Sequence, residues 1–388
     1  MLRFSQLVLP GVTMIAVTYG LARFSFGLLL PDINSTLNMS EFTSGLISSL
    51  FYLAYCFTII YSTVLTTRDG PRKMILLAGA AAVIGLMIIT VTPNAWVLGI
   101  GVLLAGSSTG LISPPYGAAI SLWINHAEQG KANTWINSGT SLGIILSGLG
   151  AIVLSPNWRI TYLIYAILTF IVLIWNYRAI PKTERTSFFQ IGELSIKGVK
   201  GAIPLIIASL ILGVSTAAFW TFSRTFIEIA GHYPDWQLSL FWVMIGIFGI
   251  LGGFSGSLIE TIGLPTAYKV GGIVLASASI ILALFPTNGV MAFASAGIFG
   301  AGYIFISGVL LVWGIKVFIT NASLGIGIPF LLLALGQVFG STLAGTWISI
   351  WSYSTTFMIS GVIGLIAILL GPKQTITHKQ IREDQQQI

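Results

Sequence analysis

Two arginines stand within long apolar stretches of this chain, and they are its clearest candidates for functional residues. Arg23 follows Tyr19 by four residues, and Arg224 follows Trp220 by four residues. A charged side chain at the centre of a bilayer costs at least about 2.5–3.5 kcal/mol, so it is a functional candidate by default. The planar guanidinium fork suits a carboxylate or a phosphate. The two arginines therefore predict the binding of an anion.

Each arginine also has a purely structural interpretation. Arg23 stands in mid-segment, where it either lines a substrate cavity or snorkels outward and bonds to backbone carbonyls. Arg224 stands near the end of its segment. It is a second contact for the anion or an outer gate, or it forms a salt bridge with Glu228 one helical turn further on. The sequence leaves both pairs of interpretations open.

Lone polar and aromatic residues supply weaker candidates. Asn137 and Gln337 each interrupt an apolar segment, and each either bonds to the substrate or joins two helices at about 0.6 kcal/mol per bond. Large aromatic residues suit a cavity wall, but individually they more often serve core packing or an interface anchor. They are Tyr19, Tyr52, Tyr116, Trp220, Tyr303 and Trp313. The substrate contacts we expect are Arg23, Arg224, Tyr19, Asn137, Trp220, Gln337 and Tyr303.

No Asp, Glu or His stands in the middle of an apolar segment, because Asp32 and Glu260 fall at segment ends and His126, His232 and His378 in loops or the tail. A proton antiporter that exports cations usually needs a buried carboxylate, so the sequence favours an anion or a neutral solute. Coupling would then come from a proton on the substrate, from exchange or from uniport. The single Cys56 excludes an internal disulfide. We expect no metal, no cofactor and no catalytic residue.

The elements that must position these residues are membrane helices. The chain has 388 residues, of which 55% are hydrophobic and 7% are charged, whereas a soluble domain carries about 25% charged residues. The apolar runs are too long and continuous for a β-barrel. About 20 residues cross a bilayer, which predicts an all-α membrane protein of about twelve helices. The expected spans are 7–30, 42–65, 74–92, 96–121, 132–154, 160–179, 202–227, 238–260, 266–285, 289–313, 324–346 and 351–370.

The basic residues sort to one side of these spans. With a cytoplasmic N-terminus, 15 of the 18 lysines and arginines fall on the inner side, and the outer loops hold Asp32, Glu41, Glu228 and Asp235. This is the positive-inside pattern. It predicts a multi-pass protein of a bacterial inner membrane with both termini in the cytoplasm. The net charge of +7 therefore indicates orientation and contact with lipid headgroups, not a nucleic-acid partner.

The chain also divides into two halves. The polar, basic stretch 180–201 predicts a cytoplasmic linker between a six-helix bundle over 1–179 and another over 202–370, with a cytoplasmic tail over 371–388. The segment that starts at Thr63 is weakly repeated 193 residues later at Gly256. Two parallel six-helix halves are a known transporter plan.

The loop after the second expected span reads Thr63-Val-Leu-Thr-Thr67-Arg68-Asp69-Gly70-Pro71-Arg72-Lys73. It matches the later positions of the signature Gly-x-x-x-Asp-Arg-x-Gly-x-Arg-Lys/Arg, while Thr63 and Thr67 replace its Gly and its acidic residue. Over nearly all of its length the chain resembles the major facilitator superfamily, which carries this loop. The stretch from Arg23 to Pro31 is similar to that of a poorly characterised bacterial branch. The resemblance implies a latch between the halves on the cytoplasmic side. Its residues here are Arg68, Gly70, Arg72 and Lys73 in the first copy, and Glu260 and Gly263 in the second.

These features together predict a secondary transporter that moves a small organic anion, such as a monocarboxylate, by alternating access. The alternative is a drug or metabolite exporter of the same superfamily. An enzyme is not expected, because the sequence has no HExxH, no clustered His and Asp and no P-loop lysine motif. A channel would need rings of charge. The expected partners are the substrate and membrane lipids, a coupling proton is left open, and we expect a monomer.

Overall fold

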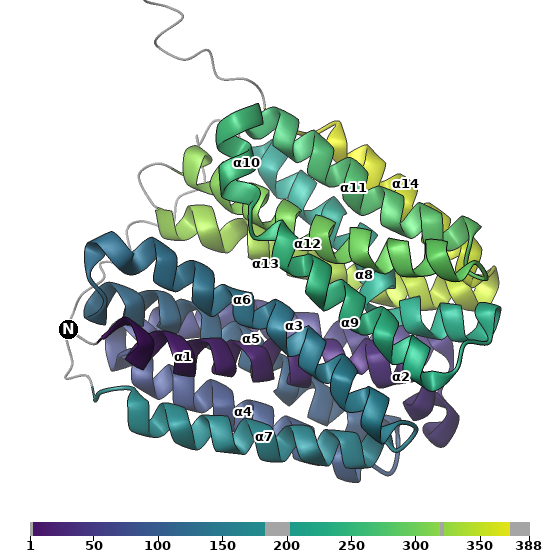
Figure 1. The fold of residues 1–388 in the computed structure, drawn as a ribbon, viewed down its shortest axis with the longest axis horizontal. Coiled ribbons are helices and arrows are strands. Elements are labelled where there is room, and N and C mark those ends of the chain that lie inside the picture. The colour runs from purple at the N-terminus through teal and green to yellow at the C-terminus, as the bar shows by residue number, and fades with distance from the viewer. Residues whose placement is uncertain (1–2, 183–201, 319–321, 373–388) are drawn as a thin grey trace, which may run out of the picture.

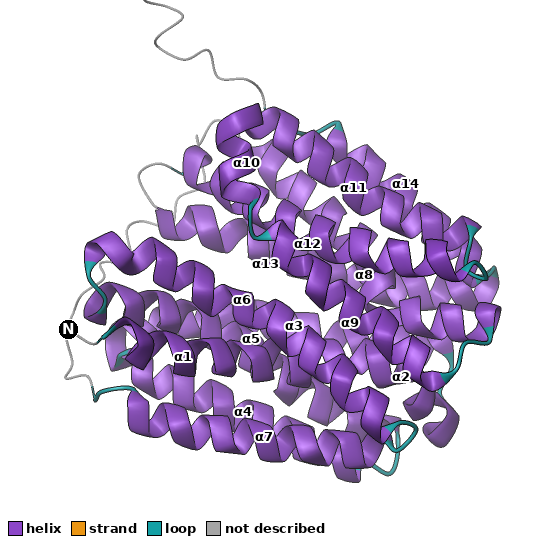
Figure 2. Ribbon diagram, viewed as in Figure 1, coloured by secondary structure: helices purple, strands orange, loops and turns teal. Residues whose placement is uncertain are grey.

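The computed structural model describes residues 3–182, 202–318 and 322–372, and these ranges form helices and short loops without a strand (Figure 2). Eleven helices are long and apolar enough to cross a membrane, and the shorter apolar helix Tyr353–Ile368 is a twelfth. The expectation of an all-α membrane protein with about twelve helices is confirmed.

The first span combines three elements, which are α1 (Phe4–Ile15), the π-helical η1 (Ala16–Phe24) and α2 (Ser25–Leu37). The rest of the N-terminal half comprises α3 (Glu41–Asp69), α4 (Pro71–Val91), α5 (Ala95–Trp123), α6 (His126–Leu154) and α7 (Trp158–Ala179). The C-terminal half comprises α8 (Ala202–Gly231), α9 (Asp235–Gly252), α10 (Ser255–Ile262), α11 (Leu264–Leu284), α12 (Gly289–Val317), α13 (Ala322–Ile350) and α14 (Tyr353–Ile368).

Local sequence signals fix many helix ends. Ser40, Asn94 and Ser352 each accept a hydrogen bond from the backbone N–H three residues further on, which caps α3, α5 and α14. The first span runs to Leu37, seven residues beyond the predicted end at 30. Hydropathy misses such ends because the last turns of a membrane helix carry polar residues that reach water.

The two groups of helices lie side by side, with α1–α7 in purple to blue-teal and α8–α14 in teal through green to yellow (Figure 1). They meet mainly where α3 packs on α13 and α6 packs on α9, with α2 against α8. That these groups act as domains 1–179 and 202–370 stays a prediction. Residues 183–201 of the predicted linker and 373–388 of the predicted tail lie outside the described residues.

The halves touch at one end of the bundle, which we call the closed end; the turns at Asn38, Ser155 and His232 lie there. Ser48 and Thr221 share a hydrogen bond of 2.8 Å across the halves. Toward the other end, which carries the N-terminus, α3 and α13 still touch at Cys56 and Leu331, but part of α6 is uncovered. The face of α6 that packs on α9 includes Ser141, and one helical turn earlier along α6 Asn137 is exposed.

Candidate functional site

Arg23 lies in η1 and is only 7% exposed. A π-helical stretch of this kind is rare and is frequent at functional sites. The helix is pressed against α6 at this level, because Gly20 and Gly143 approach so closely that a Cβ on either would overlap backbone atoms. Because both residues are glycines, the segment that carries Arg23 packs directly against the backbone of α6.

Four aromatic rings surround the Arg23 guanidinium. Its Cζ lies 4.8 Å from the ring centroid of Tyr52, 5.1 Å from Phe24, 5.2 Å from Tyr55 and 5.8 Å from Tyr19. Such contacts are worth about 0.5–2 kcal/mol each, depending on how far the ring and the cation are desolvated. They stabilise the cation in place of water, but they do not neutralise its charge.

One polar network joins Arg23 to the C-terminal half. Arg23 Nη2 donates to Gln337 Oε1 at 3.2 Å. The amide of Gln337 in turn donates to the hydroxyls of Thr216 and Tyr303, both at 3.3 Å. The fully buried Gln337 therefore uses both ends of its amide, and it ties η1 to α8, α12 and α13.

Arg23 has no counter-ion among the described residues, since no carboxylate there lies within 4.0 Å of it. Its Nε is buried without a hydrogen-bond partner. A buried charge is costly unless it is paired, so this guanidinium, with its unpartnered Nε, is suited to hold an anion. The small pocket beside it lies between the halves and is lined by Arg23, Phe24, Phe26, Gly27, Ser48, Phe51, Tyr52 and Trp220.

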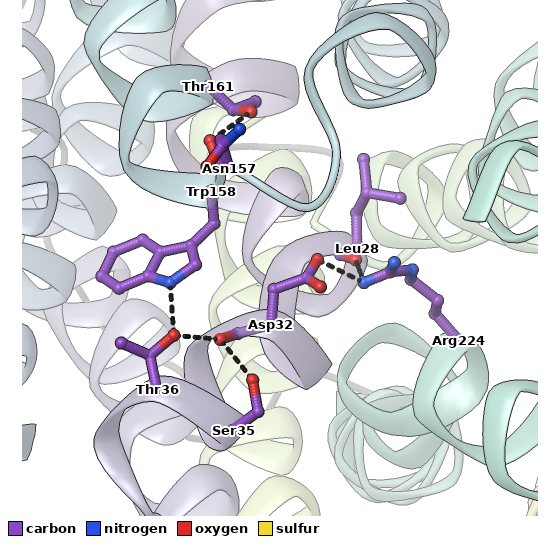
Figure 3. Close-up of polar contacts among 8 residues, drawn as sticks. All are labelled: Leu28, Asp32, Ser35, Thr36, Asn157, Trp158, Thr161 and Arg224. Atoms are coloured by element: carbon purple, nitrogen blue, oxygen red, sulfur yellow. Dashed lines mark hydrogen bonds and ion pairs between the residues drawn. The ribbon is translucent and has the colours of Figure 1, made fainter.

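Arg224 lies at a separate place, in α8 at the closed end, and is 1% exposed. Its Nη1 donates to the Leu28 carbonyl at 2.6 Å and to Asp32 Oδ2 at 3.1 Å (Figure 3). Both partners belong to α2 of the other half. In this structure Arg224 therefore pairs with Asp32 and not with Glu228, which was the partner suggested by sequence spacing.

Five of the seven predicted substrate residues lie together, and the other two lie elsewhere. Arg23, Tyr19, Gln337 and Tyr303 lie in one cluster, and Trp220 joins it by stacking on Phe24 at 4.2 Å between ring centroids and by an edge contact with Tyr303. Arg224 and Asn137 lie outside this cluster. The amide of Asn137 donates to Asn133 on the exposed face of α6.

The predicted latch residues lie at the end of the bundle that carries the N-terminus. Gly70 and Gly263 have φ of 81° and 79°, which glycine adopts without strain, and each ends a helix. Arg72 donates to the Tyr177 carbonyl at 2.7 Å and stacks on the Tyr177 ring. Lys73 and Arg68 lie 2.6 Å and 3.7 Å from Asp69, and Glu260 is exposed. Their role as a latch stays a prediction.

The sequence alone did not single out Phe24, Tyr55 or Asp32 as site residues. Tyr52 and Tyr55 are three residues apart on α3, which places them on one helix face, and this spacing was a usable signal. Asp32 carried no such signal, because its partner is 192 residues away along the chain.

A comparison with models of protein families matches residues 12–322 to the Major Facilitator Superfamily. This chain belongs to the major facilitator superfamily. Membership, together with the spans above, makes the chain a multi-pass membrane protein and a secondary transporter.

Solved structures of transporters share the fold. A mutant of the nucleoside transporter NupG matches with a TM-score of 0.76 and 14% identity, over 94% of this chain and 98% of that one. A POT family transporter solved with 5-aminolevulinic acid also matches with a TM-score of 0.76 and 14% identity, over 93% of this chain and 94% of that one. A sequence identity of 14% supports a shared fold but not a shared substrate.

Proposed function

We propose that this transporter carries a small organic anion with a single negative charge, such as a monocarboxylate, and that Arg23 binds the carboxylate. The observation that carries the proposal is a buried guanidinium with a free Nε and no counter-ion among the described residues. The adjacent pocket, of about 10 Å³, has room for about one water in this state. A carboxylate that enters as the halves part there would complete the charge pair. One cation matches one negative charge, because Arg224 is already paired with Asp32.

The pocket also suggests the shape of the substrate. Its wall is built mainly of rings from Phe24, Phe26, Phe51, Tyr52 and Trp220. Aromatic rings favour stacked or edge contacts with other rings. We therefore propose an anion with a flat, apolar body.

The site lies between the halves, as alternating access requires. Arg23 in the first half bonds to Gln337 in the second, so a substrate that displaces Gln337 from Arg23 would loosen one connection between the halves. We propose that the 1–179 and 202–370 bundles rock about this site, with Arg68 and Glu260 in a latch that closes the other end. With the N-terminus in the cytoplasm of a bacterium, as the charge pattern predicts, the present state is closed to the outside.

The test is uptake into liposomes that contain the purified protein. We expect uptake of small monocarboxylates by the wild type and its loss in Arg23→Ala. The matched control is Arg159→Ala, which removes an arginine that donates to the Thr92 carbonyl at the closed end. Unchanged uptake in Arg23→Ala, with the protein folded and inserted, would remove Arg23 from the site.

The ring-lined pocket also gives a reason for the second candidate, an exporter of flat drugs or metabolites. Such compounds need stacking surfaces more than a cation. This function predicts raised drug resistance in cells that overproduce the protein, with little change in Arg23→Ala. The liposome and resistance assays therefore separate the two functions through the same variant.

A further inference from the structure

The closed end holds more acidic than basic groups around one buried cation. Asp32 of α2 and Glu228 of α8 lie close enough to interact electrostatically with Arg224. Asp235, at the start of α9, acts on both carboxyl groups. Other titratable neighbours are Tyr353, at the start of α14, which faces Glu228, and Glu41 of α3, which faces Tyr353. His232, one turn after Glu228, donates its backbone N–H to the Glu228 carbonyl at 3.1 Å.

Arg224 donates a hydrogen bond to only one of these acidic groups. Its Nη1 bonds to Leu28 and Asp32, and its Nε is buried without a partner. Glu228 Oε2 is also buried without a hydrogen-bond partner. A buried carboxylate oxygen that lacks a donor is costly as an anion, and negative neighbours add to that cost. The protonated carboxyl group carries no net charge and avoids most of it.

We propose that Glu228 is a proton-binding site of the gate, occupied while the halves are closed at this end. When the halves part here, Asp32 moves away with α2, and Arg224 is left with Glu228, one helical turn along the same helix. Arg224 then pairs with the ionised Glu228. The proton passes from the Glu228 carboxyl group to the water that enters between the halves.

This exchange gives the gate a definite pH dependence. The closed state binds one proton more than the open state, so acid stabilises the closed state and alkali stabilises the open one. One linked proton changes the ratio of the two states by at most about tenfold per pH unit. The site is independent of Arg23, and it holds whichever solute the transporter carries.

The experiment measures the distance between two spin labels across the closed end as pH is varied, in the absence of substrate. Labels go on exposed loop positions of the two halves, Pro93→Cys and Thr287→Cys, in a Cys56→Ser background. In this protein we expect the short-distance population to grow as pH falls. Glu228→Gln, a neutral mimic of the protonated group, should stay at the short distance throughout. Glu128→Gln, the same change at an exposed site of α6 near the other end, should titrate like its parent.

A second variant tests the exchange of partners. In Asp32→Asn, Arg224 is free to pair with Glu228 in both states, so we expect more of the long distance and a loss of the pH dependence. The proposal is overturned if the parent protein shows no shift with pH. It is equally overturned if Glu228→Gln or Asp32→Asn titrates as the parent does. None of these results depends on Arg23, so they neither support nor contradict the proposed anion site.

Discussion

Nη1 of Arg224 lies 3.1 Å from Oδ2 of Asp32, although the two residues are 192 positions apart and belong to opposite halves. The turn that carries Asp32 is itself held in place. The Asp32 carbonyl accepts from Ser35 and Thr36, and the Trp158 indole N–H donates to Thr36 at 3.0 Å (Figure 3). Arg224 is therefore connected through α2 to the start of α7, and this pair closes one end of the interface.

The first prediction concerns the strength of this pair. Asp32→Ala removes the charge partner that the fully buried Arg224 has in the other half. Breaking a buried pair in this way costs up to about 3–5 kcal/mol, and pairing of Arg224 with Glu228 recovers only part of it. We expect a clear fall in the midpoint of thermal unfolding in detergent. The control is Asp235→Ala, which removes an exposed carboxylate and should change stability by about 0.5 kcal/mol or less. Equal effects of the two variants would contradict the pairing.

The second prediction concerns Gln337. In Gln337→Glu a carboxylate takes the place of the amide oxygen that lies 3.2 Å from Arg23 Nη2. This internal counter-ion would neutralise Arg23 and compete with the substrate. We expect anion binding to weaken by at least about tenfold, which is about 1.4 kcal/mol, while the protein stays as stable as the wild type.

The control for that change is Gln337→Met, which keeps the length of the side chain but removes its hydrogen bonds. Loss of these bonds costs about 0.5–1.5 kcal/mol each in stability, and Arg23 keeps its free charge. We expect the Met variant to bind the anion and the Glu variant to fail. Calorimetric titration of the purified proteins measures both. Binding by the Glu variant at wild-type affinity would show that Arg23 does not hold the anion.

The fold was accessible from sequence because the bilayer imposes a strong pattern on the chain. Long apolar runs predicted about twelve helices and sorted cations their orientation. The polar stretch 180–201 and the weak repeat predicted two halves, and their action as domains stays a prediction. Arg23 was found for the same reason, since a charge is conspicuous among hydrocarbon side chains. Gln337 carried the same kind of signal, but its three hydrogen bonds required coordinates.

The pairing of Arg224 was not accessible from sequence. Local spacing favours Glu228, which is four residues on, but Asp32 from the other half takes its place in the folded chain. Which distant helix approaches depends on how the halves pack at this end. The exposure of Asn137 has the same origin. Its helix face packs on α9 only from Ser141 onward, and sequence periodicity does not report where two packed helices separate.

The third prediction uses two carboxylates of equal charge that differ only in their six-membered ring. Benzoate and cyclohexanecarboxylate carry the same charge, but only benzoate has an aromatic ring. Stacking in a ring-lined pocket is worth about 0.5–1.5 kcal/mol beyond burial, so we expect benzoate to bind about two- to tenfold more tightly. Trp220→Leu should remove most of this preference while uptake still depends on Arg23. Equal affinity of the wild type for both acids would reject the flat-substrate proposal but not the anion site.

The fourth prediction concerns the close approach of the halves at Gly27. A Cβ on Gly27 would overlap the carbonyl oxygen of Trp220 in the other half and lie 3.0 Å from the Trp242 ring. Gly27→Ala should therefore hold the closed end apart, at a cost of about 1–3 kcal/mol for overpacking. We expect a larger long-distance population between the labels at positions 93 and 287, and slower uptake.

The matched control is Gly117→Ala in the C-terminal part of α5, where an added Cβ meets nothing within 4 Å. Because alanine favours a helix over glycine by about 0.5–1 kcal/mol, this variant should be slightly stabilised, with unchanged label distances. The contrast isolates the contact between the halves from the general effect of adding a methyl group to a membrane helix. If the two variants gave the same distances and the same uptake, the approach of Gly27 to Trp220 would have no part in closing the gate.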